Sequence, residues 1–140
     1  MILLDTNVLS EAMKPAPDPA VLFWLDAQIA EDLFLASITL AELKFGVAAM
    51  PAGRRKESLA AVLDGLLALT RGRVLAFDAA AADRYAEIAV RARSVGRTLL
   101  LADGYIAAIA STHGFAVATR DAGPFLAAGL ETFEPWSMRP

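Results

Sequence analysis

Short apolar segments alternate with longer amphipathic segments along this chain. Apolar runs at residues 1–4, 33–37, 74–77, 116–118 and 130–133 predict buried β-strands, because each run is short and bounded by polar or turn-forming residues. Between these runs, apolar positions recur every three or four residues, which predicts helices over about 5–13, from 19 onward, and over 39–50, 55–69, 79–95 and 98–112. The alternation predicts one α/β domain over residues 1–140, with a parallel sheet of four to five strands covered by helices on both faces.

Several residues at the ends of the predicted helices are typical of those positions. Asp18 and Asp78 each precede a helix, where a carboxylate can accept from the free N–H groups of the first turn. Gly96 is placed to end the helix over 79–95. Within that helix, the four-residue spacing of Glu87 and Arg91 predicts an ion pair along its surface.

Four acidic residues, Asp5, Glu42, Asp103 and Asp121, each lie just past an apolar segment. Asp5 and Asp121 follow predicted strands, whereas Glu42 and Asp103 fall in the first turns of predicted helices. The carboxyl ends of parallel strands meet at one edge of a sheet, so we expect the four acids to gather there. Close carboxylates repel by about 4 kcal/mol per pair at an effective dielectric near 20. Such a cluster requires a cation or bound protons, and it therefore predicts a metal-dependent reaction.

Each acid also has a purely structural interpretation. Asp5 can cap the first helix, and Glu42 can form a capping box with Thr39. Asp103 can interact with the dipole of its helix, and Asp121 is typical of a turn. No single acid indicates a functional site by itself, but the expected gathering of all four at one edge of the sheet favours one.

Composition narrows the possible chemistry. The 140 residues include no cysteine, a single histidine (His113, at a predicted helix end) and a formal net charge of −3. Disulfides, thiolate zinc sites, cysteine nucleophiles and paired-histidine mechanisms are therefore excluded. The net charge argues against strong nonspecific binding to nucleic acid, although a local basic patch can coexist with it. No apolar run reaches the ~18 residues of a membrane span, and Asp5 interrupts any signal peptide, so we expect a cytoplasmic protein.

Four motifs in order resemble those of PIN domains: Leu-Asp-Thr-Asn-Val-Leu-Ser-Glu at 4–11, Ala-Ser-Ile-Thr-Leu-Ala-Glu-Leu-Lys-Phe-Gly at 36–46, Leu-Ala-Asp-Gly-Tyr-Ile-Ala-Ala-Ile-Ala at 101–110 and Ala-Thr-Arg-Asp at 118–121. The group that the chain resembles is the VapC/FitB-like toxins of type II toxin–antitoxin modules. This resemblance implies a PIN-like three-layer αβα fold and a Mg²⁺- or Mn²⁺-dependent ribonuclease held inactive by a cognate antitoxin. Relatives often carry Asn where Asp121 stands and Asp where Pro124 stands, so Asp121 is expected to be the fourth carboxylate here.

An all-oxygen site suits Mg²⁺ or Mn²⁺ better than Zn²⁺. We expect Asp5 and Asp103 to bind the ion directly, and Glu42 and Asp121 to act through metal-bound water or to help deprotonate the nucleophile. In-line attack by water leaves a 5′-phosphate and a 3′-hydroxyl.

Polar residues beside the acids are candidate supporting groups. The resemblance points to Thr6 and Asn7 as residues that orient the acids, and Thr119 lies close to Asp121 in sequence. Arg120, adjacent to that acid, is expected to contact a phosphate. Thr6 and Thr119 have an equally good interpretation as partners of backbone groups at the strand ends.

Some apolar residues of the chain cannot all be buried on one face of their helix, and they indicate contacts with protein partners. Phe23 and Trp24 are consecutive, Phe45 and Val47 follow Glu42, and Trp136 lies near the chain end. We expect some of these residues to line a homodimer interface, a higher toxin–antitoxin assembly, or a groove that takes an antitoxin helix.

Three other functions share part of this pattern. A phosphoacceptor domain of the response-regulator type needs a lysine near its last strands, but the lysines are Lys14, Lys44 and Lys56. A catalytically inactive PIN-like binding module is disfavoured by the four acids. A flap-type DNA nuclease shares the metal chemistry, but it needs further elements to thread a DNA junction.

Overall fold

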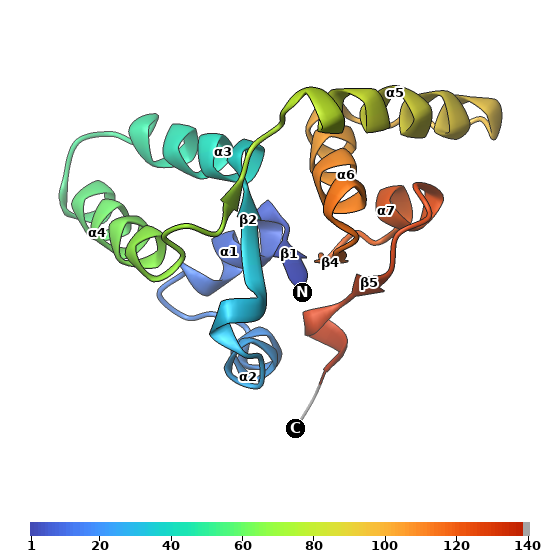
Figure 1. Cartoon of the computed structure of the whole chain (residues 1–140). Helices are drawn as coiled ribbons and strands as arrows, with labels where there is room; N and C mark the ends of the chain where they lie inside the picture. Colours follow the sequence, from blue (N-terminus) through green and yellow to red (C-terminus); the bar gives the residue numbers. More distant parts are fainter. Residues whose placement is uncertain (139–140) are drawn as a thin grey trace.

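The computed structural model describes residues 1–138 and contains a parallel sheet of five strands (Figure 1). The strands are β1 (Ile2–Leu4), β2 (Leu33–Ala36), β3 (Val74–Leu75), β4 (Ala116–Ala118) and β5 (Thr132–Phe133). Their order in the sheet is β3-β2-β1-β4-β5, and every neighbouring pair is parallel. The predicted parallel sheet is confirmed, and β1 occupies its centre.

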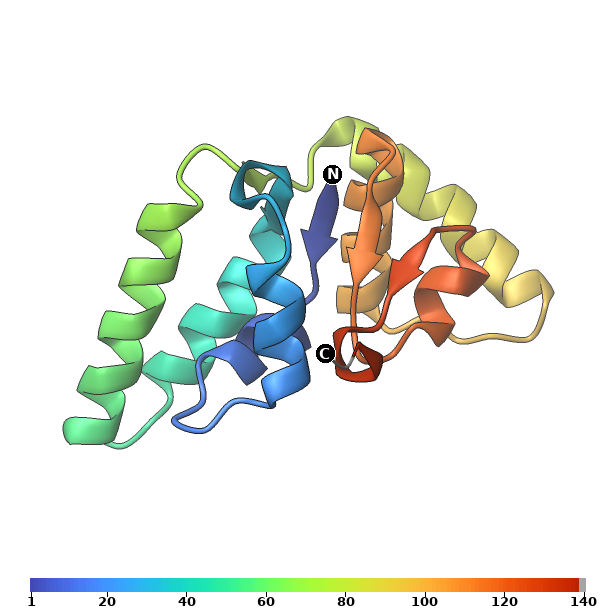
Figure 2. The ribbon, with the colours of Figure 1, turned by 90° about the horizontal axis from the view of Figure 1, so that it is seen from below.

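Helices cover both faces of this sheet (Figure 2). They are α1 (Thr6–Ala12), α2 (Pro19–Asp26), α3 (Ser37–Ala48), α4 (Arg54–Leu69), α5 (Ala79–Ser94), α6 (Leu101–His113) and α7 (Gly123–Ala127), with short 3-10 helices at Ala30–Asp32 (η1) and Pro135–Ser137 (η2). Helices α1 to α4 lie on one face and α5 to α7 on the other, which confirms the three-layer αβα arrangement.

The central strand supplies both cores because successive side chains point to opposite faces of a sheet. Leu3 is paired with Val117 of β4, and both pack in the core beneath α5, α6 and α7. Leu4 is paired with Leu35 and packs in the core beneath α1 to α4. All four side chains are almost fully buried, so the register of β1 is fixed by burial on its two faces.

Two predicted helix starts are confirmed. The carboxylate of Asp18 accepts from the N–H of Ala20, and that of Asp78 accepts from the N–H of Ala81, each at 2.9 Å. His113 ends α6, as expected, and is followed by Gly114 in the left-handed conformation.

The predicted capping box of Thr39 and Glu42 is wrong, because α3 begins two residues earlier than expected. Ala36 is the N-cap residue, and the Ser37 hydroxyl accepts from the N–H of Phe77. Thr39 is therefore buried inside the helix, where its hydroxyl lies 3.3 Å from that of Thr6.

Other local predictions also need correction. Glu87 pairs with Arg84 at 3.1 Å and not with Arg91. Helix α6 begins at Leu101, later than predicted, and the short helix α7 was not predicted.

Gly104 allows α6 to pack closely against α5. It is buried, and a Cβ atom there would lie 2.8 Å from Cε2 of Tyr85 and 3.1 Å from Cδ2 of Leu99. Gly65 of α4 provides a comparison, since nothing lies within 4 Å of a Cβ added there.

We expect Gly104→Ala to lower the free energy of unfolding by about 1–3 kcal/mol, because the aromatic ring has to move. Gly65→Ala should instead raise it by about 0.5–1 kcal/mol, because alanine favours a helix. Urea denaturation of both variants tests this contrast, and equal effects would show that the α5–α6 approach is not close.

Candidate active site

The sheet topology brings the four acids to one end of the molecule. Asp5 directly follows β1, and its backbone N–H donates to the carbonyl of Ala118 at the end of the neighbouring β4. Asp121 comes three residues after that strand end, between β4 and α7. Glu42 lies in α3, which follows β2, and Asp103 lies in the first turn of α6.

Asp5 is buried, with 5% of its surface exposed. Its carboxylate accepts from the N–H of Thr6 at 2.8 Å and from the Thr119 hydroxyl at 2.8 Å. It also accepts from the amide nitrogen of Asn7 at 3.2 Å. Asp5 is therefore the N-cap residue of α1, as one interpretation held, and its carboxylate is held in a fixed orientation.

Asn7 and Thr119 connect the ends of β1 and β4. The fully buried Thr119 hydroxyl accepts from the Asn7 amide at 3.3 Å and from the Asp121 N–H at 3.1 Å. The Asn7 side-chain oxygen accepts from the N–H of Arg120 at 3.1 Å. These contacts orient Asp5 and fix the backbone at positions 119–121.

Glu42 is exposed at the surface of α3. The Thr6 hydroxyl donates to its Oε1 at 2.7 Å. Thr6 thus connects the start of α1 to the carboxylate of α3, and it holds Glu42 beside Asp5.

Three of the acids, Asp5, Glu42 and Asp103, line one cavity of about 430 Å³. Asp121 does not line it, although its charge acts on the cavity. Burial raises the pKa of Asp5, and the charges of Glu42 and Asp121 raise it further, against the hydrogen bonds from Thr119 and Thr6. Burial also raises the pKa of Asp103, followed by repulsion from Asp5, Asp121 and Glu42. The four carboxylates therefore lie within electrostatic reach of one another.

The donor chemistry of this cavity fits Mg²⁺ or Mn²⁺. Its candidate ligands are carboxylate oxygens, and neither histidine nor cysteine lines it. Within residues 1–138, no group of three or more His, Cys, Asp or Glu side chains is arranged to hold a metal ion. Mg²⁺ commonly takes one or two carboxylates and keeps several waters, so this geometry fits a partly hydrated ion and not a complete protein cage.

Sequence reasoning missed part of the cavity wall. Ser10, Glu11 and Lys14 line it from α1 and the turn that follows, and Trp136 lines it from η2. The spacing along the predicted helix could have indicated part of this wall, because Asn7, Glu11 and Lys14 are four and three positions apart and so share one helix face.

A second, apolar groove of about 620 Å³ adjoins the acidic cavity. Its apolar lining comes from α1, α3 and α4 and includes Met13, Leu43, Val47, Met50, Leu59 and Val62. Four residues line both hollows, namely Thr6, Ser10, Lys14 and Glu42. The groove therefore leads directly to the acids.

The residues expected to meet partners have different environments. Val47 lines the apolar groove, and Trp136 lines the acidic cavity. Phe23 and Phe45 are 47% and 75% exposed. Trp24, by contrast, is 5% exposed and packs in the core, and its neighbour Phe23 stays outside, as expected for two consecutive apolar residues of one helix.

A parallel sheet with clustered acids beyond its carboxyl edge defines the class of protein, and comparison with known sequences defines the family. Residues 2–129 match the PIN domain family profile, and the chain belongs to this family. The chain is 54% identical over 137 residues to "VapC ribonuclease Y4jK" of Sinorhizobium fredii, covering 97% of this chain and 98% of that protein. It is 48% identical over 137 residues to "Toxin FitB" of Neisseria gonorrhoeae, covering 97% and 99%.

Solved structures agree with these sequence relationships. The fold superposes with a TM-score of 0.95 on a chain of the "Structure of FitAB bound to IR36 DNA fragment", at 45% identity, covering 100% of this chain and 99% of that chain. It superposes with a TM-score of 0.93 on the "Crystal Structure of FitAcB from Neisseria gonorrhoeae", at 48% identity, covering 97% and 99%.

The raised pKa of Asp103 predicts a pH-dependent stability in the absence of metal. The folded chain binds this proton more tightly than the unfolded chain, so the free energy of unfolding falls as pH rises from the ordinary carboxyl range through the raised pKa. With a chelator present, Asp103→Asn should therefore have a higher Tm than wild type at neutral pH. The difference should shrink in acid, where Asp103 is protonated.

Asp64→Asn, on the exposed surface of α4, serves as the matched control for thermal melts across pH. A wild-type Tm equal to that of Asp103→Asn at every pH would contradict the electrostatic account of the cavity.

Proposed function

We propose that this chain is a metal-dependent ribonuclease toxin of a toxin–antitoxin pair. The observation that carries the proposal is the convergence of Asp5, Glu42 and Asp103 on one cavity in which two carboxyl pKa values are raised. Two further facts support it: membership of the PIN domain family, and high identity over nearly the full length to proteins named as a VapC ribonuclease and a FitB toxin.

In this proposal Asp5 and Asp103 would hold a Mg²⁺ or Mn²⁺ ion, and Glu42 and Asp121 would act on it through water. Such an ion supplies charge to polarise the scissile phosphate, acidify a bound water and stabilise the leaving oxygen. Thr119 and Asn7 fix the orientation of Asp5.

Glu42 is the residue best suited to accept a proton from the attacking water. It is exposed at the cavity, and Thr6 donates to one of its oxygens while the other remains available. Attack by water in line with the 3′ oxygen breaks the bond between phosphorus and that oxygen; it leaves a 5′-phosphate, and the departing 3′ oxygen takes a proton from solvent to become a 3′-hydroxyl.

Substitution of the proposed ligands tests the metal-dependent reaction. We expect Asp5→Asn and Asp103→Asn each to reduce RNA cleavage at least about 100-fold, because each removes a charge that holds the ion. Asp64→Asn on α4 removes an equal charge outside the cavity and should cleave as wild type does. Cleavage is measured on total RNA with and without a chelator, and the 5′ ends are mapped.

Products with a 2′,3′-cyclic phosphate, or equal cleavage by all three variants, would contradict the mechanism. Chelator-resistant cleavage would remove the metal from it.

The apolar groove is the site that we propose for the antitoxin. Solved structures of relatives are described as FitAB and VapBC complexes, some bound to DNA. In this chain, the groove beside the acids is apolar and open along α4, where Val62 is 44% exposed. A helix in this groove would bury that apolar surface and cover the mouth of the acidic cavity, which accounts for inhibition.

Val62→Asp tests this site without touching the acids. A charge in the apolar groove should weaken antitoxin binding by about 2 kcal/mol, because the carboxylate loses its water when the partner docks. Val90→Asp, on the exposed face of α5 outside the groove, is the control. The measurement is growth on coexpression with the antitoxin encoded beside this chain, together with cleavage by each variant alone.

We expect Val62→Asp to cleave RNA normally and to escape inhibition. Full inhibition of Val62→Asp would place the antitoxin elsewhere.

A homodimer, alone or within a larger toxin–antitoxin assembly, remains part of this proposal. Large apolar side chains outside the groove are strongly exposed, among them Phe45 at 75% and Leu100 at 70%. Surfaces of this kind commonly mark protein contacts. No helix within residues 1–138 is both long and apolar enough to span a bilayer.

A further inference from the structure

The acidic cavity also has two cations in its wall. Lys14 and Arg120 line it together with the three acids. A polyanionic RNA that approaches clustered carboxylates in a chain of net charge −3 is repelled, so cations at the cavity itself have a direct role to play.

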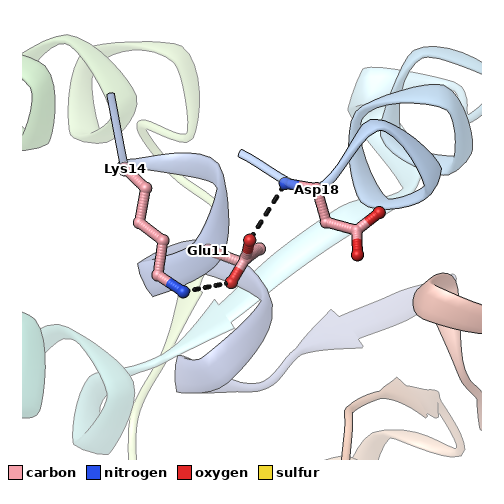
Figure 3. A network of polar contacts seen from close by, with 3 residues as sticks. All are labelled: Glu11, Lys14 and Asp18. Atoms are coloured by element: carbon pink, nitrogen blue, oxygen red, sulfur yellow. Dashed lines mark hydrogen bonds and ion pairs between the residues drawn. The ribbon is translucent and has the colours of Figure 1, made fainter. Parts of the chain in front are cut away.

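Lys14 is held in place by a buried carboxylate (Figure 3). Glu11 accepts from Nζ of Lys14 at 2.6 Å through one oxygen and from the N–H of Asp18 at 2.9 Å through the other. The Lys14 side chain is 56% exposed, whereas that of Glu11 is only 10% exposed. The hydrogen bonds from Lys14 and Asp18 lower the pKa of Glu11, with a smaller contribution from the charge of Arg120. The carboxylate therefore stays ionised.

An ammonium group has three N–H donors, and Glu11 takes one of them. Among residues 1–138, Glu11 is the one side chain that accepts a hydrogen bond from Lys14, so the other two N–H donors remain available to a ligand. Since Lys14 lines both the acidic cavity and the apolar groove, these donors lie where the two hollows meet.

Arg120 is held by an aromatic ring and not by an acid. Its guanidinium carbon lies 5.3 Å from the centre of the Trp136 ring, and its backbone N–H donates to Asn7. Trp136 is half-buried and packs against the core beneath α1 to α4. Within the described chain, the guanidinium makes no ion pair, so no carboxylate neutralises its positive charge and its N–H groups can bind an anionic ligand.

We propose that Lys14 and Arg120 each bind one backbone phosphate of single-stranded RNA at the cavity, with Glu11 as a positioning residue for Lys14. This proposal rests on the ribonuclease function proposed above. Cationic side chains that follow the backbone beside an aromatic ring are a common arrangement for binding single strands without sequence preference.

Salt dependence of RNA binding tests the two phosphate contacts. The probe is a labelled oligouridylate of about twelve nucleotides. Its binding to the Asp103→Asn chain, which does not cleave it, is measured in the presence of Mg²⁺ at several salt concentrations. Lys14→Ala and Arg120→Gln should each raise Kd about fivefold and reduce the slope of log K against log salt by about 0.7, the value for one phosphate contact on a single strand.

Lys44→Ala and Arg71→Gln make the same charge changes at exposed positions outside both hollows, and they should leave the slope unchanged. In the chain that retains Asp103, Lys14→Ala and Arg120→Gln should raise KM for cleavage of the same probe with little change in kcat.

The two levels of the proposal fail in different ways. If the parent chain cleaves RNA, but Lys14→Ala and Arg120→Gln match their controls in slope and KM, the phosphate contacts are overturned and the ribonuclease function stands. If the chain neither binds nor cleaves RNA, the ribonuclease function itself fails, and this inference fails with it.

A double-mutant cycle tests the role of Glu11. Glu11→Gln keeps an oxygen for the N–H of Asp18 but removes the charge that holds Lys14. If Glu11 positions Lys14, then Lys14→Ala should raise Kd less in the Glu11→Gln chain than in the parent chain. If Glu11 merely neutralises Lys14, the Glu11→Gln substitution frees the lysine. Lys14→Ala should then raise Kd more in the Glu11→Gln chain than in the parent chain, and this result would overturn the positioning role.

Discussion

Negative charge gathered at the carboxyl end of β1 has to be compensated before this fold can be stable. Asp5 is buried, and the charges of Glu42 and Asp121 act on it. Burial of a carboxylate is unfavourable unless hydrogen bonds or a cation compensate. The fold supplies hydrogen bonds from Thr6, Asn7 and Thr119, and the cavity that Asp5 shares with Asp103 is the place that we propose for a cation.

The sheet order makes this arrangement possible. With β1 between β2 and β4, the chain leaves three adjacent strands at the same edge, and Asp5, Glu42 and Asp121 follow those strands. Asp103 reaches the same place from the start of α6, which Gly104 allows to pack closely on α5. The segments that hold Asp5 also position the two cations of the cavity, since Lys14 lies just past the helix that Asp5 caps and Arg120 lies beside Thr119.

Elements governed by local chemistry could be predicted from the sequence. The strands, the N-caps at Asp18 and Asp78, and the location of the four acids follow from periodicity, capping and the parallel topology. The start of α3 could not be predicted, because Ser37 and Thr39 are both good N-cap residues. Neither becomes the N-cap: Ala36 takes that position without a side-chain hydrogen bond, and the Ser37 hydroxyl instead accepts from the N–H of Phe77, forty positions away in the chain.

The same reason explains what was missed at the site. Lys14 was not among the predicted site residues: its three-residue spacing from Glu11 is visible in the sequence, but its place beside both hollows depends on how α1, α3 and α4 pack. Trp136 belonged to a group of apolar residues of which some were expected to meet protein partners, and the packing of η2 places it at the acidic cavity. Contacts between distant segments depend on packing, which periodicity does not encode.

We propose that a divalent ion binds between carboxylates contributed by distant segments of the chain. Anomalous diffraction from a crystal of the chain soaked in Mn²⁺ shows where such an ion binds. We expect a single strong peak or a close pair of peaks within bonding distance of Asp5 and Asp103, with Glu42 and Asp121 reaching it through water. A crystal with Mn²⁺ bound elsewhere and no peak between Asp5 and Asp103 would contradict it.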